Sequence, residues 1–90
     1  ENGMANNDKP TSEGKVYDKD RIEFLNLHLN QILSCLNEGL PVKGYFAWSL
    51  LDNYEWAFGY SKRFGLVYVD FDSFKRIPKK SYYEFSKYLA

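Results

Sequence analysis

The residues best suited to chemistry lie in the stretch Trp48–Trp56, where a carboxylate, Glu55, stands in a loop between two indoles. An indole face can stack on a sugar ring, and a neighbouring carboxylate can accept hydrogen bonds from two hydroxyl groups. A second carboxylate, Glu1, precedes Asn2 and Gly3. Hydrolysis of a glycosidic bond with retention of configuration needs two carboxyl groups about 5 to 5.5 Å apart, and the spacing permits Glu1 and Glu55 as this pair. A sugar-binding module would carry the same loop, so both interpretations stay open.

The composition argues against several other classes of protein. Twelve basic and 12 acidic side chains give a formal net charge of +0, so no global field directs the chain to nucleic acid or to an anionic membrane. No apolar run approaches the roughly 20 residues of a membrane-spanning helix, and no signal-peptide order is present. The single cysteine, Cys35, has no partner within the chain, which favours a reducing compartment. We expect a cytoplasmic protein without nucleic-acid or membrane partners.

The elements that must position these residues follow from composition and periodicity. Residues 1–17 are rich in polar and turn-forming types and are predicted to form an active-site loop. Apolar residues then recur at three- and four-residue steps, which predicts a helix over 19–38 with one buried face. This apolar stripe comprises Ile22, Leu25, Leu29, Ile32, Leu33 and Leu36. Asp18 is the candidate N-cap of the helix, and Gly39 and Pro41 supply its stop.

The second half of the chain continues the α/β pattern. The nearly continuous apolar run 42–51 predicts a strand buried on both faces. A sugar-binding loop over 52–62 follows at its carboxyl end, where ligand loops of parallel α/β folds lie. An extended run over 63–70 and a C-terminal helix over 78–89 complete the chain. This order is that of the last quarter of a (β/α) barrel, and 90 residues are too few to close one.

Several residues outside the loop are predicted to have structural roles. Pro78 suits the first turn of the C-terminal helix, while Ser81 and Glu84 match a capping box that starts slightly later. His28 lies on or beside the apolar stripe and is predicted to be a hydrogen-bonded structural residue. The basic residues near the C-terminal helix are predicted to be solvated surface charge. They are Lys79, Lys80 and Lys87.

A family resemblance covers nearly the whole chain. The segment 42–85, VKGYFAWSLLDNYEWAFGYSKRFGLVYVDFDSFKRIPKKSYYEF, resembles the C-terminal signature region of family 1 glycoside hydrolases, the β-glucosidase and β-galactosidase type. The opening Glu1-Asn2-Gly3 is similar to the family's Thr/Ser-Glu-Asn-Gly motif without its first residue. The resemblance implies that residues 1–90 form the C-terminal fragment of a single (β/α)8 TIM-barrel catalytic domain. This fragment would run from the end of strand 7 through helix 8 and be incomplete by itself.

The resemblance also implies a role for each candidate site residue. Glu1 would be the catalytic nucleophile at the end of the seventh strand, forming a covalent glycosyl-enzyme intermediate. Trp48 would be the platform beneath the sugar. Glu55 would hold its 4- and 6-hydroxyls, and Trp56 would donate its indole N–H to the 3-hydroxyl. Phe64 is expected near the C6 edge of the sugar.

The Glu55 position also narrows the expected substrate. Glu55 would repel a 6-phosphate, which favours an unphosphorylated β-glucoside, β-galactoside or β-fucoside. Further polar and aromatic residues are expected to brace the loop by hydrogen bonds or ion pairs. They are Asn53, Tyr54, Tyr60, Asp70 and Arg76.

The resemblance places the general acid/base upstream, in the family's Asn-Glu-Pro motif. The expected partners are therefore the β-glycoside substrate and the N-terminal portion of the barrel that carries the acid/base, and this chain alone is expected to be inactive. No cofactor is expected, because the reaction needs only two carboxyl groups and water. The alternative functions are a non-catalytic carbohydrate-binding module and an inactive split-barrel fragment.

Overall fold

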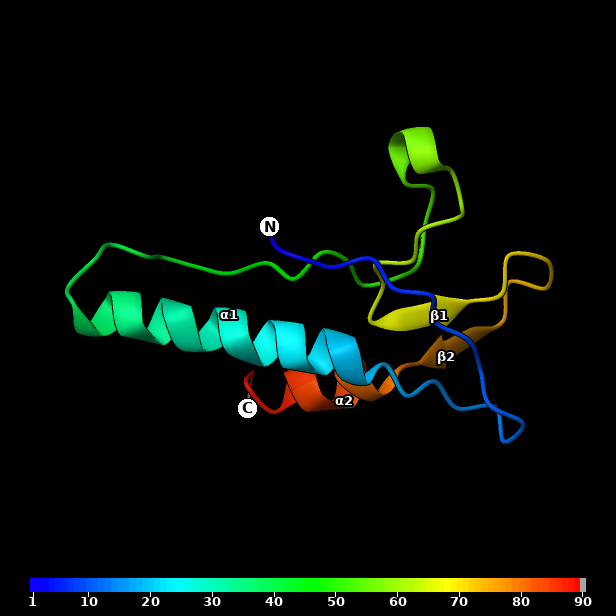
Figure 1. Ribbon diagram of the computed structural model, residues 1–90, viewed down its shortest axis with the longest axis horizontal. Helices are drawn as coiled ribbons and strands as arrows, with labels where there is room; N and C mark the ends of the chain where they lie inside the picture. Colours follow the sequence, from blue (N-terminus) through cyan, green and yellow to red (C-terminus); the bar gives the residue numbers. More distant parts are fainter. Residues whose placement is uncertain (90) are drawn as a thin grey trace.

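A computed structural model describes residues 1–89 of the chain. Figure 1 shows an elongated α/β piece, 47 × 30 × 19 Å along its principal axes, in which a long helix lies beside a short one and a small sheet lies at one end. In chain order the elements are α1 (Lys19–Asn37), the 3-10 turn η1 (Trp56–Phe58), β1 (Val67–Val69), β2 (Arg76–Pro78) and α2 (Lys80–Ser86). Neither helix of the described part is both long and apolar enough to cross a membrane.

Helix α1 spans Lys19–Asn37, where the apolar spacing predicts a helix over 19–38. Of its apolar stripe only Leu25 is buried, whereas Leu33 and Leu36 are 56% and 48% exposed. The expectation of a continuous buried face was therefore wrong for the C-terminal half of the helix. The reason is that α2, the helix packed against α1, lies under its N-terminal half (Figure 1).

The predicted strand over 42–51 does not form as a continuous element. Ala47 pairs with Asn2 in one isolated parallel bridge, and Leu51 pairs with Val67 in another. A strand requires a ladder of successive pairs, and within residues 1–89 this run makes only those two bridges. The apolar run is therefore extended chain that pairs with its neighbours at only two points, and its first part runs back alongside α1 (Figure 1).

The small sheet differs in part from the sequence expectation. Strand β1, Val67–Val69, lies inside the predicted extended run 63–70. Strand β2, Arg76–Pro78, was missed, and it pairs antiparallel with β1 so that Tyr68 faces Ile77. A three-residue strand that ends in proline gives no periodic signal, and proline is tolerated there because β2 is an edge strand.

Helix α2 spans Lys80–Ser86, shorter than the predicted 78–89. The capping box predicted for Ser81 and Glu84 does not form, because Ser81 lies within the helix and its hydroxyl donates to Asp18. The Asp18 carboxylate also accepts the backbone N–H of Ser81 at 2.9 Å. Asp18 makes no side-chain cap on α1, and the backbone N–H group that its carboxylate binds belongs to the first turn of α2.

The interior of this piece is more polar than apolar. Its buried aliphatic side chains are Val16, Leu25, Leu66, Val67 and Val69. Its buried polar residues are Asp8, Asp18, Arg21, Ser49, Asp52, Lys79 and Ser81. The expectation that Lys79 is solvated surface charge was wrong, because its ammonium lies between the Asp8 and Asp52 carboxylates and has no exposed area.

Two glycines lie where segments of main chain meet. A Cβ atom added at Gly3 would lie 2.0 Å from the Trp48 carbonyl oxygen, and one added at Gly65 would lie 2.3 Å from the Asp52 backbone nitrogen. Both contacts are far shorter than any van der Waals distance and involve backbone atoms that cannot rotate away. Only a residue without a side chain allows these close approaches.

Replacing Gly65 by alanine is expected to lower the free energy of unfolding by about 1–3 kcal/mol, because the new methyl group overpacks against the Asp52 backbone. Thermal unfolding followed by circular dichroism measures the change. Gly44→Ala is the matched control, since an added Cβ there meets nothing within 4 Å. Equal unfolding temperatures for the two variants would contradict the close approach at Gly65.

Candidate active site

The segment that begins at Glu1 lies beside the segment that carries Trp48. The Asn2 N–H donates to the Phe46 carbonyl at 3.0 Å, and the Trp48 N–H donates to the Asn2 carbonyl at 2.7 Å. Together with the close approach of Gly3 to the Trp48 carbonyl, these bonds form a main-chain clamp on both sides of Asn2. The predicted nucleophile is thus one residue away from a fixed backbone position beside the predicted sugar platform.

Tyr45 fixes the side chain of Asn2. Its phenol donates to Asn2 Oδ1 at 2.8 Å. Burial raises the pKa of the Tyr45 phenol above its ordinary value of 10.0, so the hydroxyl stays protonated and remains a donor throughout the neutral range. Asn2 is therefore held through both its backbone and its side chain, immediately next to Glu1.

Trp48 and Glu55 are brought together by the turn of the chain between them. The indole Nε1 of Trp48 donates to Glu55 Oε2 in a long hydrogen bond of 3.4 Å. Trp48 is 38% exposed and Glu55 is half-buried, so both keep surface open to solvent. The peptide bond from Trp48 to Ser49 is cis. This pair forms an open wall with an aromatic ring and a carboxylate side by side.

The other two predicted sugar contacts, Trp56 and Phe64, stand apart from this pair. Trp56 opens the turn η1 with a φ of 45° and is 83% exposed. Phe64 is half-buried and meets Ser49 through its backbone, whose carbonyl accepts the Ser49 N–H at 3.0 Å. Among the described residues no hydrogen bond or ring contact links the side chain of either residue to the Trp48–Glu55 pair.

The loop that carries these residues is braced at its base by polar and aromatic contacts. Asn53 Nδ2 donates to the Leu51 carbonyl at 2.8 Å. The rings of Tyr54 and Tyr60 pack edge to face with centroids 5.3 Å apart, and Tyr60 also packs on Phe71 at 4.5 Å. Figure 1 shows that the loop nevertheless projects away from the body of the molecule, with η1 at its tip.

The remaining two predicted braces act elsewhere. Asp70 accepts the backbone N–H groups of Asp72 and Ser73 at 2.9 and 3.2 Å, and these bonds hold its pKa below the ordinary value of 3.8. It therefore stabilises the turn between β1 and β2. Arg76 is exposed in β2. The expectation that these two residues brace the sugar loop was wrong, because the hairpin that was missed in the sequence carries them away from it.

Asp52, the first residue of the loop, is the functional-site neighbour that sequence analysis missed. Its carboxylate accepts hydrogen bonds from Lys79 Nζ at 2.8 Å and from Arg63 Nη1 at 2.7 Å. It also accepts the backbone N–H groups of Gly65 and Val69 at 2.9 and 3.3 Å. The charged partners lie 27 and 11 residues along the chain, and no local spacing reveals such pairs. The only sequence signal is a carboxylate placed directly after an apolar run.

The contacts of Asp52 continue into a larger cluster. Lys79 Nζ also lies 2.6 Å from Asp8 Oδ2, which in turn accepts Arg21 Nη1 at 2.6 Å. Arg21 Nη1 reaches Asp18 Oδ2 at 2.7 Å as well. We refer to this set as the buried ion network. Its members are three carboxylates and three cations, Asp8, Asp18, Arg21, Asp52, Arg63 and Lys79.

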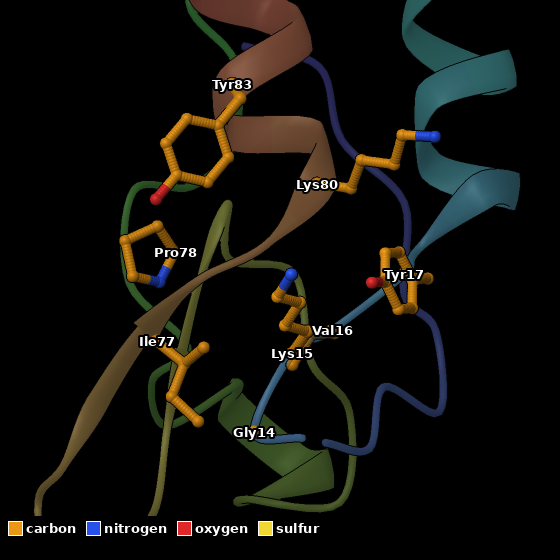
Figure 2. Close-up of a pocket in the computed structure, with 8 residues that line it drawn as sticks. All are labelled: Gly14, Lys15, Val16, Tyr17, Ile77, Pro78, Lys80 and Tyr83. Atoms are coloured by element: carbon orange, nitrogen blue, oxygen red, sulfur yellow. The ribbon is translucent and has the colours of Figure 1, made fainter. Parts of the chain in front are cut away.

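A hollow of about 450 Å³ lies between the loop at 14–17 and the junction of β2 with α2. Figure 2 shows its walls, which include Lys15, Tyr17, Ile77 and Tyr83. None of the predicted site residues lines it, and its walls carry no carboxylate. The hollow therefore cannot host carboxylate chemistry. Within residues 1–89 no group of three or more metal-ligating side chains converges on one point.

Comparison with known proteins decides the family. The sequence profile of Glycosyl hydrolase family 1 matches residues 1–90. The chain belongs to glycosyl hydrolase family 1. Beta-glucosidase A of Thermotoga maritima is 55% identical over 86 residues, which are 96% of this chain and 19% of that relative. A 6-phospho-beta-galactosidase of Clostridium acetobutylicum is 51% identical over 87 residues, 97% of this chain and 18% of the relative.

A solved structure extends the family assignment to the fold. The beta-glucosidase from Thermotoga maritima in complex with glucoimidazole superimposes with a TM-score of 0.96 at 52% identity, covering 98% of this chain and 20% of that one. Structural relatives of this kind are (β/α)8 barrels. This family 1 chain thus spans about a fifth of the length of the relatives it matches and has the structure of one part of such a barrel.

In this family 1 chain, Asp52→Ala is expected to lower the free energy of unfolding by about 3–5 kcal/mol, because it leaves the buried Lys79 and the partly buried Arg63 without a shared counter-charge. Chemical denaturation followed by fluorescence measures the loss. Asp72→Ala is the control, since Asp72 is exposed and engages Asp70 only through its backbone N–H. A loss no larger than that of the control would show that the Asp52 contacts are not formed in solution.

Proposed function

We propose that this chain supplies the nucleophile and the sugar-binding residues of a retaining β-glycosidase of the β-glucosidase, β-galactosidase or β-fucosidase type. The proposed enzyme hydrolyses terminal non-reducing β-D-glycosides through a covalent glycosyl-enzyme intermediate. The observation that carries the proposal is the main-chain clamp that pairs Asn2 with Phe46 and Trp48, because it holds the residue after Glu1 beside Trp48, whose indole donates to Glu55. Family membership supports the reaction class.

In the proposed reaction the Glu1 carboxylate attacks the anomeric carbon while the acid/base protonates the leaving oxygen. Water then attacks the glycosyl ester, the acid/base residue accepts a proton from that water, and Glu1 departs as a carboxylate. The acid/base lies on the upstream portion of the barrel in this proposal. The chain itself would run from the end of strand 7 through helix 8.

Sugar recognition falls to the open wall and its neighbours. Trp48 stacks beneath the ring, and Glu55 accepts hydrogen bonds from the 4- and 6-hydroxyls. Trp56 is 83% exposed, which leaves its indole N–H free to donate to the 3-hydroxyl. Phe64 lines the C6 edge. Because the Trp48–Glu55 hydrogen bond is long at 3.4 Å, the carboxylate can exchange this weak partner for sugar hydroxyls at little cost.

The upstream portion of the barrel is the proposed partner of this chain. Support comes from large apolar side chains that lie on the surface, where contiguous apolar area is typical of a protein interface. On and after α1 they are Leu33, Leu36 and Leu40, each between 48% and 56% exposed. An upstream portion packed on α1 would complete the buried face that its apolar stripe predicts.

An aryl β-glucosidase assay tests the proposed nucleophile. In a grafted barrel, residues 1–90 replace the matching segment of the Thermotoga maritima relative, which supplies the upstream portion. We expect the grafted barrel to hydrolyse an aryl β-glucoside and Glu1→Gln to reduce kcat by about a thousandfold or more, because no nucleophile remains. Glu23→Gln, which changes an exposed carboxylate of α1, is the control.

Labelling separates catalysis from mere binding. A 2-deoxy-2-fluoro glycoside should leave a glycosyl ester on Glu1 that peptide mass spectrometry locates. Sugar binding without an ester and without hydrolysis would refute the proposal and favour a carbohydrate-binding module or an inactive split-barrel fragment.

We further propose that the substrate is unphosphorylated, although one relative is named a 6-phospho-beta-galactosidase. The Glu55 carboxylate would face a 6-phosphate, and such like-charge contacts cost several kcal/mol. The grafted barrel is expected to prefer an aryl β-glucoside over its 6-phosphate by at least about tenfold in kcat/KM. Glu55→Gln should narrow this ratio, and an equal or inverted preference in the unmodified graft would contradict the prediction.

A further inference from the structure

The buried ion network takes no chemical part in the reaction proposed above, yet it joins the segment that begins at Glu1 to both ends of the sugar-binding loop 52–62. We propose that Lys79 is a positioning residue, which fixes the sugar-binding loop 52–62 against the segment that begins at Glu1 and thereby sets the geometry between nucleophile and sugar wall. This inference rests on the proposed function and adds to it a residue that the sequence alone assigns to the surface.

The contacts of Lys79 join three separate parts of the chain. Its ammonium lies 2.6 Å from Asp8 in the N-terminal segment and 2.8 Å from Asp52 at the start of the loop. Its own backbone N–H donates to the Leu66 carbonyl at 2.9 Å, directly before β1. The side chain has no exposed area, so water does not screen either ion pair. Lys79 therefore links the N-terminal segment to the sugar-binding loop through two ion pairs that are buried away from water.

The C-terminal end of the sugar-binding loop is also held by the Asp52 carboxylate. Arg63 follows the loop, and its Nη1 donates to Asp52 Oδ2 at 2.7 Å and to the Val69 carbonyl at 2.8 Å. Its guanidinium also lies over the rings of Tyr68 and Phe71, 4.1 and 4.6 Å from their centroids. Asp52 at the start and Arg63 at the end thus close the loop with a single ion pair, and Lys79 anchors that pair.

The N-terminal segment has a second connection to the loop. Arg21 pairs with Asp8 at 2.6 Å, and its Nη2 donates to the Arg63 carbonyl at 2.8 Å. The backbone N–H of Asn6 donates to the same carbonyl at 3.0 Å. Asp8 therefore cannot shift without disturbing the residue that ends the loop. The network couples the positions of both site segments.

Energetics favour a positioning role over a purely stabilising one. A buried ion pair replaced by apolar groups of similar volume is often as stable or more stable, so charge burial is a poor way to gain stability alone. Charge-assisted hydrogen bonds, however, fix distance and direction in a way that apolar contacts do not. Catalytic geometry rewards such precision, since a misplacement of about 1 Å can cost about a hundredfold in rate.

The test compares Lys79→Met with Lys87→Met in the grafted barrel. Lys79→Met retains the length of the side chain and removes its charge, whereas Lys87 is 70% exposed and serves as the control. At a temperature where each variant is folded, we expect kcat for an aryl β-glucoside to fall about a hundredfold in Lys79→Met and to be unchanged in Lys87→Met. Inactivation by the fluoro glycoside should slow in parallel, and a crystal structure should show the loop displaced.

Asp8→Asn provides a second, nearly isosteric variant, expected to lower kcat in the same direction by a smaller factor. It decides the question by the same readouts if Lys79→Met does not fold. A merely structural role would lower the unfolding temperature and leave the kcat of the folded variants unchanged. A folded variant with kcat within about twofold of the parent and an unmoved loop would overturn the inference.

Failure of the proposed function has a different signature, namely an unmodified graft that neither hydrolyses the glucoside nor forms the ester on Glu1. In that case the crystal structure of Lys79→Met or Asp8→Asn still decides whether the network positions the loop.

Discussion

A charge that is buried away from water requires partners, and this requirement organises the structure. The ammonium of Lys79 needs counter-charges in the interior, and the chain brings Asp8 and Asp52 to it from segments far apart in sequence. Each carboxylate in turn recruits an arginine, Arg21 or Arg63. The ion pairs of Asp8 and Asp52 with Lys79 therefore determine the paths of the N-terminal segment and the sugar-binding loop more than the few buried aliphatic side chains do.

Local patterns predicted what depends on neighbours in sequence. The three- and four-residue spacing of leucines locates α1 to within a residue, and the Glu-Asn-Gly and Trp-Ser-Leu-Leu-Asp-Asn motifs mark two segments that do lie side by side. The exposure of Leu33 and Leu36 was not predictable from the helix, because an apolar stripe shows which face is apolar but not what covers it.

Other features depend on partners that no window of sequence contains. Lys79 lies in a basic stretch that is typical of a solvated surface, and its partner Asp8 is 71 residues away. The hairpin of β1 and β2 has three residue pairs, too few for an alternation of apolar and polar residues to be visible in the sequence. Because the hairpin was not predicted, Asp70 and Arg76 were wrongly expected to brace the sugar-binding loop. The run 42–51 has the composition of a buried strand, but a strand is defined by its neighbours, and within residues 1–89 this run makes one isolated bridge with Asn2 and one with Val67.

The close approach of Gly3 to the Trp48 carbonyl has a consequence for how such a site can diversify. Because the two segments touch through backbone atoms, the separation between the residue before Asn2 and the aromatic platform is a property of the main chain. Side chains around the sugar can then be exchanged, one hydroxyl contact at a time, without altering that separation. In the proposed enzyme, recognition and bond cleavage would thereby be decoupled, so that one unchanged cleavage geometry could serve sugars that differ around the ring.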